Sequence, residues 1–332
     1  MGERSCSQES QRLSSIKLVP QILCSNLVES GQDLLEIDMS VKKLVEDLES
    51  TSIETQRGAA AKLRQLARHN VGNRVIIANH RAISLLVNLL QSTDFETQEN
   101  AVTTLFNLSL DGNNKAAIVN AGAIEPLVHV LWTGNPEARE NSAAVLCSLS
   151  SISENRVNIV KSGAICPLVE LLENGSPRGK KAAATAFYNL SLSRENRVMI
   201  VEANAVCHLI ELMDPATGLP DKAVAAVLAN LASIPEGRTA IVNAGGIPVL
   251  VEVVELGSAK GKEFAAAALL HICINSRFCG MVVREGAVPP LVVLSQSGTQ
   301  RAKEKAQQLL NFFKQQRRAD ADADADADAG RE

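Results

Sequence analysis

The chain has 332 residues, of which 46% are apolar and 3% aromatic, and its formal net charge is −4. A general nucleic-acid binder usually carries a basic excess, so this balance argues against nucleic acid as the partner. The seven cysteines contain no C-x-x-C pair, so we expect no metal and no cofactor. The longest apolar run, residues 264–274, is too short for a membrane-spanning helix, so we expect no membrane insertion.

The first 38 residues are serine-rich and show no sustained periodicity. We expect a mobile N-terminal leader here, with at most a short helix over residues 16–28 that Pro20 interrupts. Helical patterns then begin at Met39–Leu48 and at Glu54–Ala67. Together these two segments predict a first structural unit that lacks its opening helix, as terminal units of repeat arrays often do.

A complete unit is clearest over residues 113–151. Asn114–Asn120 is expected to be a short helix, and Gly122 follows it where a left-handed residue would end that helix. Ile124–Leu131 is the expected second helix. Pro136 suits the first position of a third helix that continues to about residue 150. The unit is therefore predicted to contain three helices.

The same unit recurs along the chain at steps of 40 to 42 residues. One series consists of polar residues near the end of each third helix. Its members are Gln65, Asn107, Ser148, Asn189, Asn230, His271 and Asn311. A second series marks the left-handed position, at Gly122, Gly163, Gly245 and Gly286, with Asn204 in the remaining place. A fixed period of this size indicates stacked helical units that share one continuous core.

Two segments depart from the repeat. Pro215, Gly218 and Pro220 predict a looser turn before a third helix that starts near Asp221. After the array, residues 319–328 read ADADADADAD, and we expect these self-repelling carboxylates to form a solvated tail without a fold. The predicted domains are a leader over 1–38, a repeat array over 39–316 and a disordered Ala-Asp tail over 317–332.

Three helices in each unit, a glycine between the first two, and a third helix ending in Leu-x-Asn-Leu resemble the armadillo repeat. The resemblance covers residues 40–316, and segments such as NAGAIEPLVHVL resemble the armadillo arrays of plant U-box ubiquitin ligases. It implies an all-α fold, a right-handed superhelical solenoid of about seven armadillo repeats. Residues 1–38 are too short to hold a U-box and show no trace of one, so ligase activity would require a U-box from elsewhere.

The resemblance also implies that the third helices line a concave groove, where the amide of each one holds the backbone of an extended peptide. A side-chain amide carries both a donor and an acceptor, so it can bind any peptide group regardless of sequence. Gln65, Asn107, Asn189, Asn230 and Asn311 would serve directly, whereas Ser148 and His271 would alter the contact. The alternative is that these amides satisfy main-chain groups between helices.

Charged residues form two further patterns. The first helices begin with a series of cations, Arg74, Lys115, Arg156, Arg197 and Arg238. These could form a basic ladder for an acidic partner, but we favour a solvated edge, since a cation gains nothing at a helix N-terminus. The early third helices start with acidic residues and the later ones with basic residues. The candidate charged rim is Glu99, Glu140, Lys180, Lys181 and Lys262. We therefore expect a bipolar bound segment, with its acidic end toward the C-terminal units.

The predicted function is protein–protein interaction, with substrate or partner recognition in ubiquitin-dependent signalling. The alternatives are a ubiquitin-independent scaffold and a nuclear-import-like adaptor. Import adaptors resemble one another in a Trp-x-x-x-Asn pair, and this chain has Thr103 and Thr185 in the tryptophan positions. The five histidines occupy different helical positions without a nucleophile nearby, so we expect no catalytic site. We expect a monomer or weak oligomer in the plant cytoplasm, with the nucleus as a second compartment.

Overall fold

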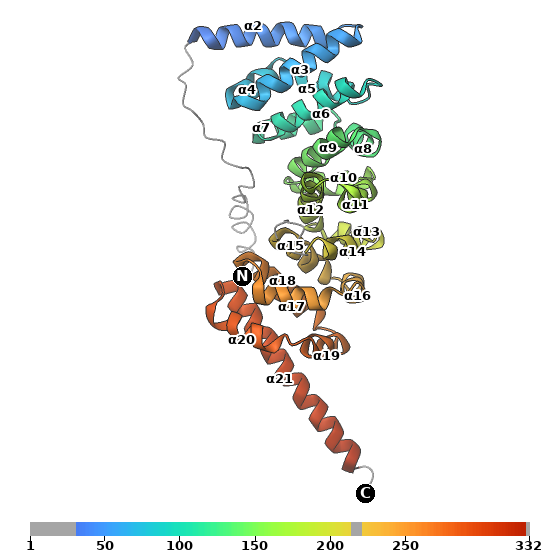
Figure 1. Cartoon of the computed structure of the whole chain (residues 1–332), viewed down its shortest axis with the longest axis vertical. Helices are drawn as coiled ribbons and strands as arrows, with labels where there is room; N and C mark the ends of the chain where they lie inside the picture. Colours follow the sequence, from blue (N-terminus) through green and yellow to red (C-terminus); the bar gives the residue numbers. More distant parts are fainter. Residues whose placement is uncertain (1–30, 214–220, 330–332) are drawn as a thin grey trace, which may run out of the picture. The chain divides into compact units, whose positions relative to one another are not determined.

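The computed structural model describes residues 31–213 and 221–329, and within these ranges it contains 20 helices and no strand (Figure 1). The chain divides into two units, Met1–Met39 and Ser40–Glu332. Helix α2 (Gly31–Leu48) begins in the first unit, and the repeats lie in the second. The short helix expected over residues 16–28 and the turn around Pro215 lie outside the described residues.

The helices of the second unit recur in threes. The first helices are α4 (Val71–Asn79), α7 (Gly112–Asn120), α10 (Ser153–Lys161), α13 (Arg194–Glu202), α16 (Pro235–Asn243) and α19 (Ser276–Arg284). The second helices are α5 (Ala82–Leu89), α8 (Ile124–Thr133), α11 (Ile165–Asn174), α14 (Ala205–Glu211), α17 (Gly246–Leu256) and α20 (Val288–Ser297). The third helices are α3 (Ile53–His69), α6 (Phe95–Ser109), α9 (Pro136–Leu149), α12 (Pro177–Ser191), α15 (Asp221–Ala232), α18 (Ala259–Ile272) and α21 (Gln300–Ala329). This order confirms the three-helix repeat.

The third helices form the layer that connects the repeats. Each one packs on the third helix before it and the one after it, from α3 through α6, α9, α12, α15 and α18 to α21. Within a repeat, the first and second helices turn sharply, and α7 and α8 meet at 88°. Because every repeat contacts its neighbours, the apolar side chains share one continuous core, as in other solenoids.

Helix α12 shows why these segments fold as they do. Ser176 caps its N-terminus by accepting a hydrogen bond from the Gly179 N–H, and Pro177 occupies the first turn. Ala183, Phe187 and Leu190 follow at helical spacing and are buried, with Phe187 fully enclosed. The small alanine lets neighbouring helices approach closely, and the large side chains fill the space between them.

A capping residue also joins two repeats. Asp94, at the N-terminus of α6, accepts a hydrogen bond from the Thr97 N–H at 2.9 Å. Its carboxylate also accepts hydrogen bonds from Arg57 Nε at 3.0 Å and Nη2 at 2.8 Å, and Arg57 belongs to α3. The hydrogen bonds from Arg57 and Thr97 lower the pKa of Asp94 to about 2. The residue that caps α6 therefore also forms an ion pair with a residue of the preceding third helix, α3.

The left-handed positions follow the predicted register. Gly122, Gly163, Gly245, Gly286 and Asn204 all have positive φ, between 57° and 87°. Arg81 has a φ of 61° at the equivalent place in the first repeat, which the sequence did not reveal. An arginine has no preference for this conformation, so the fold of the repeat imposes it.

Replacing Arg81 with glycine is expected to raise the free energy of unfolding by about 0.5–1 kcal/mol, since glycine adopts the left-handed conformation without steric cost. Urea denaturation would measure the change. Arg68→Gly, at an exposed site within α3, is the matched control and should lower the stability by a similar amount. Destabilisation by both variants would contradict the backbone argument.

The C-terminal segment differs from the expectation of a tail without a fold. Helix α21 extends from Gln300 to Ala329 and so continues through the Ala-Asp repeat. Alanine has the highest helix propensity, and an existing helix gains one hydrogen bond for each residue added. Helix α15 starts at Asp221, as expected.

No single helix in the described ranges is long and apolar enough to cross a membrane. Three bent pairs, α7–α8, α16–α17 and α19–α20, reach that length and composition only when their helices are combined.

Candidate functional site

The predicted amide row lies on the third helices, and its members contact the preceding repeat. Asn107 Nδ2 donates to Arg64 O at 3.4 Å, from α6 to α3. Asn189 Nδ2 donates to Cys147 O at 3.0 Å and to Ser150 Oγ at 3.1 Å, from α12 to the end of α9. The Nδ2 atoms of these two residues therefore behave as the alternative interpretation predicts, because they bond to groups of a neighbouring helix.

Two more members make the same kind of contact. Asn230 Nδ2 donates to Ser191 Oγ at 2.9 Å. Ser148 Oγ donates to Ser109 O at 2.8 Å, so the serine in this row keeps the inter-repeat bond although it lacks an amide. The row thus links successive third helices over much of the array.

Three amide oxygens of the row have no donor among the described residues. The Oδ1 atoms of Asn107, Asn189 and Asn230 accept no hydrogen bond from any described residue. Asn107 is 8% exposed, whereas Asn189 and Asn230 are half-buried.

The remaining three positions differ from one another. Gln65 and Asn311, near the two ends of the row, are exposed. His271 is half-buried, and burial together with the charges of Lys305, Arg238 and Arg197 lowers its pKa. Peptide binding at the row stays a prediction, because the hydrogen bonds described for the row join neighbouring repeats and involve no peptide.

The acidic part of the candidate rim already has basic partners. Glu99 Oε1 accepts a hydrogen bond from Arg64 Nη1 at 2.9 Å, and Glu99 Oε2 accepts one from Asn135 Nδ2 at 2.9 Å. Arg178 lies 3.2 Å from a Glu137 carboxylate oxygen and 3.9 Å from one of Glu140. These carboxylates stabilise contacts between repeats, so less of their charge is left for a ligand.

The basic part of the rim is less engaged. Lys180 is half-buried and Lys181 is exposed, and neither forms an ion pair with a described carboxylate. Lys262 Nζ donates to Glu255 O at 2.7 Å. The contrast with the acidic residues leaves the later third helices more positive than the earlier ones, as the sequence pattern indicated.

The cations at the starts of the first helices do not form a solvated edge, so that expectation was wrong. Their side chains reach back to the end of the preceding third helix. The main-chain acceptors are Ala67 O for Arg74 at 2.8 Å, Ser150 O for Arg156 at 3.0 Å and Ser191 O for Arg197 at 2.8 Å. The C-terminus of a helix carries partial negative charge, so a cation is favourable there. Burial lowers the pKa of all three guanidinium groups.

Arg238 behaves similarly, since its Nη1 donates to Ala232 O at 3.3 Å, at the end of α15. Lys115 differs, because its Nζ donates to Ser151 Oγ at 2.9 Å, just after α9, which follows α7 in the chain. The four arginines therefore cap third helices. The relevant dipole belongs to the preceding helix, not to the one that carries the arginine.

A second asparagine series, which the sequence analysis missed, lies inside the first helices. Asn73, Asn114, Asn155 and Asn196 are 1–7% exposed. Their Nδ2 atoms donate to Leu66 O, Leu108 O, Leu149 O and Leu190 O, at 3.0–3.2 Å. Leu108 O, Leu149 O and Leu190 O also accept a main-chain N–H from Asp111, Ile152 and Ser193, so each amide adds a second donor at the end of a third helix. The regular spacing of 41 residues was a signal that could have identified the series.

Within the described residues, no cluster of His, Cys, Asp or Glu could hold a metal ion. The geometry is that of stacked repeats with polar rows along the third helices. The family model described as the plant U-box protein ARM repeat region matches residues 40–327. The chain belongs to this family.

Curated relatives match shorter segments of this ARM repeat chain. It is 63% identical over 102 residues to U-box domain-containing protein 4 of Arabidopsis thaliana, covering 31% of this chain and 12% of that protein. It is 39% identical over 130 residues to U-box domain-containing protein 11 of the same species, covering 34% of this chain and 21% of that protein. The matched segments therefore span less than a quarter of either relative.

Solved structures support the same fold. An engineered protein has a TM-score of 0.72 and 33% identity, with 82% of this chain and 68% of that chain covered. A designed armadillo repeat protein in complex with the peptide (KR)4 has a TM-score of 0.61 and 25% identity, with 70% of this chain and 99% of that chain covered. ARM repeats form a non-catalytic, protein-binding solenoid, and this chain shares that architecture.

Proposed function

We propose that this ARM repeat array binds an extended peptide segment of a partner protein along the amide row. The observation that carries the proposal is the state of Asn189 and Asn230. Their Nδ2 atoms are held by the preceding repeat, whereas their Oδ1 atoms have no described donor. An amide fixed in this way presents a pre-oriented acceptor, so a peptide N–H would bind without ordering that side chain.

The match to the designed armadillo protein with its bound peptide supports this mode of binding. The matches to U-box proteins support a role in substrate or partner recognition for ubiquitin transfer. In such a role, the array would bring the partner to a U-box, which would direct the modification. The rival is a scaffold that binds the same peptide independently of ubiquitin.

A ubiquitination assay separates these two roles. The purified chain and a captured partner would be combined with activating and conjugating enzymes, with and without a U-box protein that binds the chain. Partner ubiquitination that requires both the chain and the U-box protein would support the recognition role. Capture of the partner without any modification would instead favour the scaffold.

The double variant Asn189→Ala with Asn230→Ala tests the binding surface. Each lost hydrogen bond is worth about 0.5–1.5 kcal/mol, so we expect the affinity for a captured peptide to fall about 5- to 150-fold. Fluorescence anisotropy with the labelled peptide would measure this loss.

The matched control is Asn113→Ala with Asn158→Ala, which removes two exposed asparagine side chains from first helices. Circular dichroism would verify that both double variants are folded before binding is compared. Equal affinity of the two double variants would refute the amide row as the peptide-binding surface.

A further inference from the structure

Four basic residues from four helices place positive charge near the C-terminal part of the amide row. They are Arg197 of α13, Arg238 of α16, His271 of α18 and Lys305 of α21, and we call them the basic cluster. Arg197 Nη1 donates to Ser233 Oγ at 2.7 Å, and Arg238 Nη1 lies 3.5 Å from Ser233 O. The two guanidinium groups therefore converge on a single residue just after α15. The charges of Arg197, Arg238 and Lys305 also act on His271.

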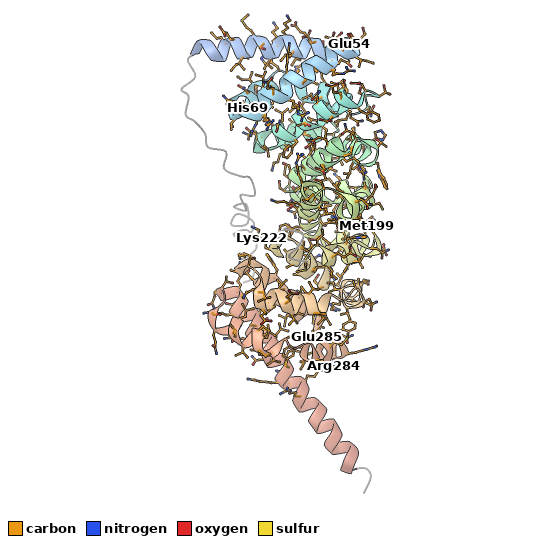
Figure 2. All side chains as sticks on the ribbon, in the orientation of Figure 1. Glu54, His69, Met199, Lys222, Arg284 and Glu285 are labelled. Carbon is orange, nitrogen blue, oxygen red and sulfur yellow. The ribbon has the colours of Figure 1, made fainter. Side chains whose placement is uncertain are left out.

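The basic cluster is continuous with the amide row. Arg197 Nε donates to Ser191 O at 2.8 Å, and Asn230 Nδ2 donates to Ser191 Oγ at 2.9 Å. Ser233 Oγ in turn donates to Asn230 O at 2.6 Å. A peptide bound at Asn230 would consequently pass within side-chain reach of the two arginines. Figure 2 shows the side chains of this region, where Lys222 marks α15 and Met199 marks α13.

No described carboxylate forms an ion pair with the basic cluster. Arginines of preceding repeats do pair with acids, such as Arg64 with Glu99 and Arg178 with Glu137. None of the four residues of the basic cluster forms an ion pair in the described part of the chain, and all the charges that act on His271 are positive. Each of the four residues is half-buried, so its charge is partly shielded from solvent. Such an excess of one sign in a partly shielded place attracts an anion.

We propose that the basic cluster binds an anionic side chain of the peptide, a carboxylate or a phosphorylated residue, beside the backbone contact at Asn230. This proposal rests on the peptide binding proposed above. Guanidinium groups suit the task because their planar donors match the oxygens of carboxylate and phosphate. The cluster is a compact site beside a backbone-binding amide in a chain of net charge −4, which favours one anion on a peptide over a nucleic-acid backbone.

The test uses the full chain and three labelled decapeptides of alternating alanine and serine, in which the central residue is phosphoserine, glutamate or glutamine. Anisotropy at low salt should show that the phosphoserine peptide binds about tenfold more tightly than the glutamine peptide, with the glutamate peptide between them. The order of the first two probes distinguishes phosphate from carboxylate as the preferred anion. Equal affinity for all three peptides would overturn the proposal.

Variants locate the effect. His271→Gln combined with Lys305→Gln removes two members of the basic cluster that make no described helix-capping bond, so the fold should be kept. The preference for the anionic peptides should fall to about twofold or less in this variant. Lys303→Gln, in the same helix, and Arg156→Gln, with the same capping role in another repeat, are the matched controls and should keep the preference. A preference that is the same in all variants would place the anion elsewhere.

A second readout does not depend on peptide binding. Titration of the His271 imidazole by NMR should show that inorganic phosphate raises its pKa, and Lys305→Gln should weaken this response. If phosphate acts on His271 but no peptide binds, the basic cluster is an anion site and the proposed peptide function fails. If peptides bind without regard to charge and phosphate has no effect, the function stands and the cluster proposal fails. Tighter binding of a single-stranded DNA decamer than of the phosphoserine peptide would overturn the assignment to a peptide.

Discussion

Replacing Asn196 with alanine is expected to lower the free energy of unfolding by about 1–3 kcal/mol, which is a large effect for one side chain. Asn196 is 1% exposed, and its Nδ2 donates to Leu190 O at 3.0 Å and to Arg156 O at 3.2 Å. One acceptor lies near the end of α12 and the other in α10, so the variant removes two hydrogen bonds between helices. Leu190 O still accepts the Ser193 N–H, so the loss is that of the two bonds, each worth about 0.5–1.5 kcal/mol.

Urea denaturation followed by circular dichroism would measure the loss. Asn158→Ala, at an exposed site in α10, is the matched control and should change the stability by no more than about 0.5 kcal/mol. Because each repeat contacts only its neighbours, hydrogen exchange should locate the weakened protection in α10, α12 and α13. Identical midpoints for Asn196→Ala and the unmodified chain would show that these bonds do not determine the stability of the stack.

The helices and their register could be predicted because the signals are local. Gly122 and Pro136 mark the boundaries of single helices, and the apolar spacing between them has the helical period. The left-handed conformation of Arg81 could not be predicted in this way, since its side chain has no tendency toward it. Only its place in the repeat, equivalent to that of Gly122, reveals it.

The contacts of the polar rows could not be predicted from the sequence, because they depend on the three-dimensional arrangement of neighbouring repeats. Arg197 looks unfavourably placed when it is assigned to the start of its own helix, but its side chain caps the preceding third helix at Ser191 O. The position of Asn189 in the row could be predicted from the repeat period. The hydrogen bond from its Nδ2 to Cys147 O could not. A side-chain amide can bond in either direction, and only the neighbouring repeat decides which atom is occupied.

A residue also cannot always be predicted from the equivalent positions in the other repeats. Asn73, Asn114, Asn155 and Asn196 suggest that asparagine belongs at every equivalent place, but the next position is Gly237. Helix α16 begins with Pro235, and its first turn approaches the end of α15. A Cβ atom at residue 237 would lie 2.0 Å from Leu231 O and 2.6 Å from Leu231 C. In this repeat, the main chains of α16 and α15 are in direct contact, and the hydrogen bond from an asparagine side chain is absent.

Gly237→Ala is therefore expected to destabilise the protein by about 3 kcal/mol, because the neighbouring main chain would have to move. The matched control is Gly58→Ala within α3, where a Cβ atom would meet nothing within 4 Å. That variant should raise the free energy of unfolding by about 0.5–1 kcal/mol, since alanine loses less conformational entropy than glycine in a helix. Urea denaturation of both variants gives changes of opposite sign if the contact at Leu231 is real. Stabilisation by Gly237→Ala would show instead that α16 can shift to follow the pattern of the other repeats.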